Sequence, residues 1–111
     1  MTKDNHHLRQ ALALAGESRE RFRHGAIVIK NGKTLGRAVN LTKNSPTVAG
    51  VPLALVSVHA EARALRRAGY PRRATVYVAR VGRMEEEPRP SQPCLSCAQL
   101  LEQLDCRVVH T

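Results

Sequence analysis

Four side chains in two short segments have the types and spacing needed for metal chemistry. His59 and Glu61 stand two residues apart, and Cys94 and Cys97 follow in the sequence Pro-Cys-Leu-Ser-Cys. Two cysteines three residues apart at a helix start can direct both sulfurs to one side, where the helix dipole favours thiolates. With the imidazole of His59 they make three ligands for zinc, which leaves the fourth position for water. Such a donor set is typical of a catalytic zinc site.

Glu61 is placed to move protons at this site. It lies two residues beyond the imidazole ligand, close to the expected water and with no need to bind the metal. Zinc lowers the pKa of a bound water to about 7, and a carboxylate within reach can take its proton and pass it on. The alternative is an ordinary acidic residue that stabilises the start of a helix.

The cysteines leave two further alternatives open. No apolar run is long enough to span a membrane, and residues 1–16 lack the apolar centre of a signal peptide, so we expect a cytoplasmic location. In that reducing compartment the three cysteines, an odd number, do not suit a disulfide framework. Cys94 and Cys97 could form a thioredoxin-like redox motif, which would make the nearby histidine and glutamate a coincidence. A structural zinc site with Cys106 as fourth ligand is the other alternative, but Cys106 lies one helix length from Cys97 and is better explained as a buried thiol.

The elements that must position these residues follow from periodicity and turn signals. Asn31-Gly32 predicts a two-residue hairpin turn, Asp4 or Asn5 can cap the first helix, and Ser57 can cap the second. Residues 40–56 lack a sustained period and contain Pro, Gly and Asn, which predicts a long loop. The expected elements are a helix to Ala15, strands Ala26–Ile29 and Thr34–Val39, a helix Ser57–Ala68, a strand Thr75–Val81, a helix Cys94–Leu104 and a strand Arg107–His110. This order predicts an α/β sheet covered by helices, with its later strands parallel.

Length and composition limit the kinds of protein this can be. At 111 residues the chain is expected to form a single domain, residues 1–111, and no apolar run is long enough for a membrane span. Aromatic residues make up only 3%, which leaves little material for stacking bases. The net charge of +9 favours anionic partners, and nucleic acid is possible among them. An arginine-rich run from Arg63 to Arg73 is either a solvated surface or a track for phosphates.

The pairing of His59-Ala60-Glu61 with Pro93-Cys94-Leu95-Ser96-Cys97 resembles the zinc-dependent cytidine/deoxycytidylate deaminase superfamily. The resemblance extends over nearly the whole chain, because the hairpin, both motif helices and the strand between them occur in the family's order. It implies a three-layer α/β/α fold with a four- to five-stranded mixed sheet. Because the chain stops at Thr111, after the fourth expected strand, we expect this fold to be shortened at its C-terminus.

The resemblance also implies roles for individual residues. His59, Cys94 and Cys97 would bind Zn2+, and Glu61 would shuttle protons. Asn40, at the end of the second strand, matches a position whose amide contacts the substrate, and Ala60 is expected to contact the substrate as well. Asn40 could equally be an ordinary residue that ends a strand.

The expected activity is hydrolytic deamination of a cytosine nucleoside or nucleotide to the uracil form, with release of ammonia. Two alternatives stay open at this point: deamination of cytosine or adenine in single-stranded DNA, RNA or tRNA, and a non-catalytic zinc-containing module that binds nucleic acid. His59 stands where free-cytidine deaminases usually have cysteine, which brings the chain closer to the deoxycytidylate, tRNA-adenosine and polynucleotide branches. A homo-oligomer is expected, because the last strand would otherwise present an open sheet edge.

Overall fold

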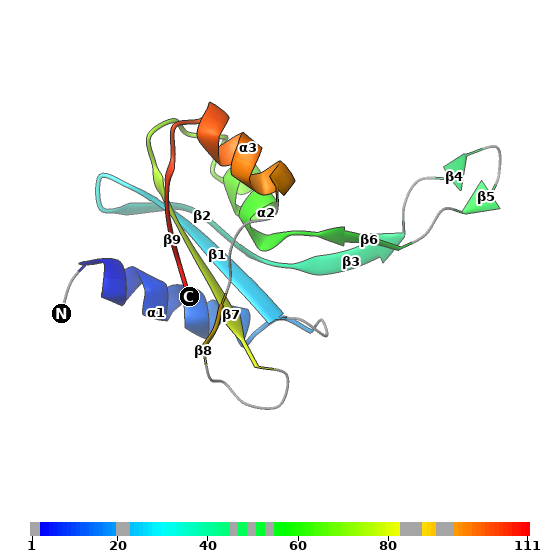
Figure 1. Ribbon diagram of the computed structural model, residues 1–111, viewed down its shortest axis with the longest axis horizontal. Coiled ribbons are helices and arrows are strands. Elements are labelled where there is room, and N and C mark those ends of the chain that lie inside the picture. The colour runs from blue at the N-terminus through cyan, green and yellow to red at the C-terminus, as the bar shows by residue number, and fades with distance from the viewer. Residues whose placement is uncertain are drawn as a thin grey trace.

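A mixed β-sheet of five strands forms the centre of the described part of the chain in the computed structural model (Figure 1). The structure describes residues 3–19, 23–44, 47–48, 51–52, 55–82, 88–90 and 95–111. The strands of this sheet are β1 (Arg23–Lys30), β2 (Lys33–Val39), β7 (Thr75–Val81), β8 (Pro88–Arg89) and β9 (Arg107–His110). β1 pairs antiparallel with β2 and with β7, while β9 runs parallel to β7 and β8 antiparallel to it.

Three helices cover the two faces of this sheet, as Figure 1 shows. α1 (Lys3–Ala15) packs on one face, and α2 (Ala60–Arg67) and α3 (Leu95–Gln103) lie on the other. Alternation along β1 serves both layers, because Ala26 and Val28 join the core under α2 whereas Ile27 and Ile29 join the core under α1. The expected α/β fold, with a mixed sheet between helical layers, is confirmed.

The predicted hairpin turn and the predicted bounds of two strands are confirmed, because the local residue types determine the backbone conformation there. Asn31 and Gly32 have φ angles of 53° and 74°, as the tight turn between β1 and β2 requires. β7 and β9 have the predicted bounds, and the predicted parallel pairing of later strands is found between them. No helix in the described residues is long and apolar enough to cross a membrane.

The prediction of a long irregular loop over residues 40–56 was wrong. β3 (Leu41–Asn44) pairs antiparallel with β6 (Leu55–Val58), and the shorter β4 (Thr47–Val48) pairs with β5 (Val51–Pro52). Figure 1 shows this region as an arm that extends away from the central sheet. Strands this short are stabilised by hydrogen bonds to a partner strand, and a two- or four-residue strand leaves no measurable period in the sequence.

Both predicted helix caps were also wrong. α1 begins at Lys3, so Asp4 and Asn5 lie inside its first turn. Ser57 is paired with Thr42 in the β3–β6 ladder, which keeps the chain extended up to residue 58 and shifts the start of α2 to Ala60. The cap position is therefore occupied by His59, whose side chain makes no capping hydrogen bond. His59 therefore stands at the start of α2 without capping it through its side chain.

Candidate metal centre

The β3–β6 ladder and α2 together place His59. Its backbone is extended, with φ −74° and ψ 147°, and the first turn of α2 follows directly. The far end of α2 is closed by Gly69, whose φ of +79° allows the amide of Tyr70 to reach the carbonyl of Leu65. The helix is thus fixed at both ends, and its N-terminal end carries both His59 and Glu61.

Small residues let α2 lie directly on β2. A Cβ atom at Gly36 would come within 2.5 Å of the Ala64 carbonyl oxygen and 2.8 Å of the Ala68 nitrogen. Two arginines of α2 add hydrogen bonds across the same contact: Arg63 donates to the Val39 carbonyl, and Arg67 donates to the Arg37 carbonyl over 2.9 Å. The position of His59 and Glu61 over the sheet therefore depends on a backbone-to-backbone approach at Gly36.

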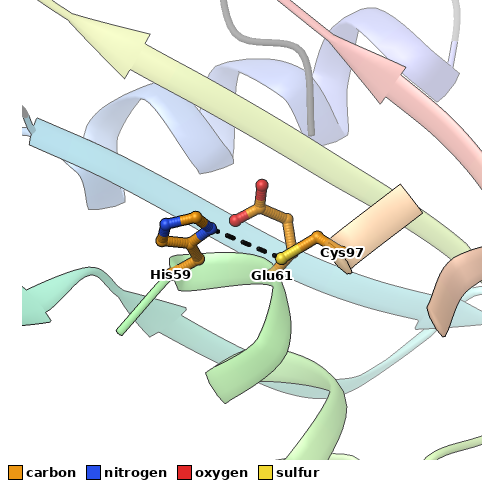
Figure 2. A group of neighbouring side chains, drawn as sticks. All are labelled: His59, Glu61 and Cys97. Atoms are coloured by element: carbon orange, nitrogen blue, oxygen red, sulfur yellow. Dashed lines mark hydrogen bonds between the residues drawn. The ribbon is translucent and has the colours of Figure 1, made fainter. Parts of the chain in front are cut away.

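α3 brings the cysteine. Cys97 is the third residue of the helix, and Leu101, one turn later, is buried in the core together with Leu65 of α2. This packing joins the two helices whose N-terminal ends carry the predicted ligands. Figure 2 shows the resulting group of His59, Glu61 and Cys97 on the side of the sheet opposite to α1.

The three side chains converge closely enough to share one ion. A ligand atom from each of His59, Glu61 and Cys97 lies within 4.8 Å of the other two. His59 Nδ1 and Cys97 Sγ are 3.5 Å apart. Cys94, the remaining predicted ligand, lies outside the described residues. A nitrogen and a thiol on two helix ends are the donors that zinc prefers, so the residues present fit a zinc ion.

The burial of the group supports the same conclusion. Glu61 and Cys97 are each only 5% exposed. A buried carboxylate is costly unless it is paired, hydrogen-bonded or close to a cation, and a divalent cation held by His59 and Cys97 would supply that charge. Because His59 and Cys97 can hold the ion without Glu61, this carboxylate can stay outside the ligand set and lie next to a molecule bound to the ion.

Asn40 has a structural role at the junction of β1 and β2. Its side-chain oxygen accepts hydrogen bonds from Ser18 Oγ over 2.8 Å and from the backbone N–H of His24 over 2.9 Å. The side chain is 8% exposed, and its own backbone N–H donates to the His24 carbonyl. Both lone pairs of this oxygen are thus engaged, so a substrate contact would have to come from the amide nitrogen. That contact stays a prediction.

Ala60 and Cys106 have surroundings that limit what they can do. The side chain of Ala60 is fully buried in the core under α2, so only its backbone can reach a substrate. Its N–H belongs to the first helical turn, where amides have no acceptor within the helix.

Cys106 is not part of the group formed by His59, Glu61 and Cys97 in the described residues. Its thiol is half-buried instead of buried as predicted, and it faces the Pro71 carbonyl at 3.5 Å.

His24, on which His59 acts electrostatically, and its strand partner Arg80 were missed by the sequence analysis. His24 and Arg80 are direct partners in the β1–β7 register, and alternation places both on the face that carries α2. Burial lowers the pKa of His24, and the positive charge of Arg80 and then the proximity of His59 lower it further. The sequence did contain a signal for His24, because it alternates with the apolar residues at positions 26 and 28 and should therefore lie on the same face of the strand. The register that brings Arg80 beside it could not be read from the sequence.

The comparisons with known proteins agree with this geometry. Residues 1–111 match the family described as the cytidine and deoxycytidylate deaminase zinc-binding region. A search of curated protein sequences gave no significant match.

The solved structures that resemble the chain include a deoxycytidylate deaminase and a larger protein. The dCMP deaminase of cyanophage S-TIM5 in its apo form has a TM-score of 0.69 at 20% identity, covering 99% of this chain and 84% of that one. The same enzyme in complex with dCMP and dUMP has a TM-score of 0.68 at 19% identity, covering 99% and 82%. Acinetobacter baumannii RibD has a TM-score of 0.59 at 27% identity, covering 97% of this chain and 27% of that one. The family match over the full sequence decides the assignment, and the chain belongs to the zinc-binding cytidine and deoxycytidylate deaminase family.

Proposed function

We propose that this protein catalyses the hydrolytic deamination of cytosine in a nucleoside or nucleotide, giving the uracil form and ammonia. The observation that carries the proposal is the buried Glu61 carboxylate within 4.8 Å of the ligand atoms of His59 and Cys97. The choice of cytosine is supported by the fold shared with a dCMP deaminase whose structure includes dCMP and dUMP.

His59 and Cys97 would hold the zinc, with Cys94 as the proposed third ligand. When bound, zinc supplies a water of lowered pKa next to the substrate. Glu61 would take one proton from the water whose oxygen bonds to the amino-bearing carbon and deliver it to the ring nitrogen, and it would then carry that oxygen's second proton to the amino group, which leaves as ammonia when the C–N bond breaks. The low exposure of Glu61 keeps bulk solvent from competing for these protons.

Proton transfer by Glu61 can be tested apart from metal binding, because the proposed metal donors are other side chains. His59 precedes α2 and Cys97 belongs to α3, whereas Glu61 is held within the first turn of α2. Replacing Glu61 with glutamine therefore leaves both described metal donors and the side-chain shape in place. The variant separates proton transfer from metal binding.

The test uses the zinc-loaded protein, and ammonia release is measured with cytidine, deoxycytidine, CMP, dCMP, adenosine and single-stranded oligonucleotides. We expect turnover of a cytosine mononucleoside or mononucleotide, and we expect Glu61→Gln to keep its zinc while turnover falls by about 10² to 10⁴. Glu102→Gln, on an exposed position of α3, is the matched control and should retain full activity. Activity confined to oligonucleotides or to adenosine would contradict the proposed substrate, and normal turnover in Glu61→Gln would remove Glu61 from the mechanism.

A further inference from the structure

The chain leaves the central sheet at Val39 and Asn40, which together form the β2–β3 junction. Val39 ends β2 and pairs with Gly25 of β1, and the backbone N–H of Asn40 donates to the His24 carbonyl, as the next step of that ladder would. In a regular antiparallel ladder the returning bond from the His24 N–H goes to a backbone carbonyl. Here the side-chain oxygen of Asn40 accepts it over 2.9 Å. The side chain thus completes the last pair of the sheet while the backbone turns toward β3.

Ser18 holds the same oxygen from a second side. Its hydroxyl donates to Asn40 Oδ1 over 2.8 Å, and its backbone N–H donates to the Ala15 carbonyl at the end of α1. Both side chains are buried, so water competes little for this hydrogen bond. With two donors on one carbonyl oxygen, the amide group cannot rotate without losing a buried hydrogen bond. Ser18 therefore fixes the side chain on which the β2–β3 junction depends.

The β2–β3 junction is connected to His59 by a single step of the β3–β6 ladder. Leu41, the residue after Asn40, pairs with Val58, the residue before His59. Paired residues of an antiparallel ladder have Cα atoms about 5 Å apart. The direction in which the chain leaves Asn40 therefore determines where the strand that ends beside His59 lies.

The first turn of α2 contacts the same junction. Arg63 donates from its side chain to the Val39 carbonyl, and its backbone N–H donates to the His59 carbonyl. His59 is thus joined to the junction by two routes, through the β3–β6 ladder and through Arg63. Ser18 belongs to neither route, and its hydrogen bond connects the junction to the segment between α1 and β1.

We propose that Ser18 is a positioning residue of the metal centre, which by fixing Asn40 sets the direction of the strand pair that ends at His59. Ser18 acts through Asn40 and has no part in the chemistry. Support of this kind matters because metal–ligand distances tolerate deviations of only about 0.2 Å. Residues that orient a ligand directly typically change metal affinity by about 10- to 100-fold, and Ser18 lies further from the ligand than such residues do.

The experiment measures the zinc affinity of the parent protein and of Ser18→Ala by competition with a chromophoric chelator. We expect the affinity of Ser18→Ala to be about 3- to 10-fold lower, the factor that one hydrogen bond typically contributes. Tyr77→Phe is the matched control, because it also removes one hydroxyl, which donates to Asp4 over 2.7 Å on the α1 side of the sheet. It should unfold at lower urea concentration and keep the zinc affinity of the parent.

The same comparison separates positioning from a general loss of stability. If Ser18→Ala is destabilised as Tyr77→Phe is but binds zinc as tightly as the parent, Ser18 only stabilises the fold and the proposal is overturned. Ser18→Thr keeps a hydroxyl donor and should restore most of the zinc affinity. An affinity in Ser18→Thr as low as that in Ser18→Ala would contradict a role for the hydroxyl.

A double-mutant cycle tests whether Ser18 acts through Asn40. If it does, the variant that combines Ser18→Ala with Asn40→Ala should have the zinc affinity of Asn40→Ala alone. Independent effects that multiply in the double variant would overturn the proposed route, and the comparison of Ser18→Ala with Ser18→Thr decides the role of the hydroxyl even if Asn40→Ala does not fold. None of these measurements uses a substrate, so their outcome is independent of the proposed deamination.

Discussion

Adding one methyl group at Gly36 tests whether the close approach of α2 to the sheet sets the geometry of the metal group. In Gly36→Ala the new Cβ would lie 2.5 Å from the Ala64 carbonyl oxygen, whereas ordinary contacts of this kind begin at 3.4 Å. The difference is 3.4 − 2.5 = 0.9 Å, and the contacting atoms belong to backbone and cannot rotate away. The helix must therefore shift by a large part of that distance, at a cost of about 1–3 kcal/mol of folding free energy.

The shift should also weaken zinc binding, because α2 carries His59 while Cys97 is on α3. Metal–ligand distances tolerate deviations of only about 0.2 Å, and disturbed support of a ligand typically costs 10- to 100-fold in affinity. Zinc affinity measured by competition with a chromophoric chelator should fall by about that factor in Gly36→Ala. Urea unfolding of the zinc-free protein measures the loss of stability separately.

Gly25→Ala is a control with nearly the same steric conflict on the other face of the sheet. Its Cβ would lie 2.6 Å from the Ala11 carbonyl oxygen and from the Ala15 nitrogen, both in α1. A similar loss of folding free energy is expected, with zinc affinity within about threefold of the parent, because α1 carries none of the proposed ligands. Equal zinc affinities in the two variants would show that the sheet absorbs the strain, and the reasoning about Gly36 would be refuted.

Three further predictions concern the metal, the acid stability and the assembly. Cys97→Ala should lose most of its bound zinc and unfold at lower urea concentration, whereas Cys106→Ala should keep its zinc content, as measured by metal analysis of the purified proteins. Hydrogen bonds from Arg107 and then from Tyr77 hold the pKa of Asp4 below its ordinary value of 3.8. The ionised Asp4 carboxylate therefore stabilises the fold at pH values above 3.8, and this stabilisation is lost as the pH falls through the pKa of Asp4 in the folded state. Asp4→Asn should therefore flatten the acid side of the stability curve, and an unchanged curve from urea titrations at about pH 6 down to about pH 2 would contradict this. Among the described strands β9 pairs only with β7, so we expect a homo-oligomer by light scattering at micromolar concentration, and a monomeric mass with full activity would contradict it.

The parts of the fold that could be predicted are those in which a residue's own chemistry fixes the backbone. Asn31-Gly32 adopts the positive φ angles of a tight turn, and the β-branched runs at 75–81 and 107–110 form strands with the predicted bounds. The start of α2 could not be predicted, because Ser57 has good capping chemistry but is held in an extended strand by its pairing with Thr42. The β3–β6 pairing thus outweighed the local preference of Ser57 for a helix cap. Thr42, the partner of Ser57, is too far away in the sequence for a short window to reveal the pairing.

In the candidate site, too, local sequence predicted some features, while others depend on contacts between distant parts of the chain. The spacing of His59 and Glu61 predicted a carboxylate beside a metal donor, and the structure places Cys97 with them. The structural role of Asn40 could not be predicted, since its two hydrogen-bond donors, Ser18 and the His24 amide, come from a loop and a strand that precede it by 22 and 16 residues. The pairing of Arg80 with His24 was missed for a related reason, because it depends on the β1–β7 register.

The positive charge of the chain bears on the choice between a mononucleotide and a polynucleotide substrate. Of the arginines between residues 63 and 73, Arg63 and Arg67 donate to carbonyls of β2, and Arg73 forms an ion pair with Asp105 at 3.7 Å. The guanidinium groups of Arg63 and Arg67 fix the helix that carries His59, so their charge is explained by the positioning of the metal group. A strand-binding track would instead need a continuous row of cations directed at solvent, with aromatic side chains for the bases to stack on. In the described part of the chain the aromatic residues are Tyr70 and Tyr77, and Tyr77 is buried on the α1 side of the sheet. These observations support the proposed nucleoside or nucleotide substrate over a polynucleotide.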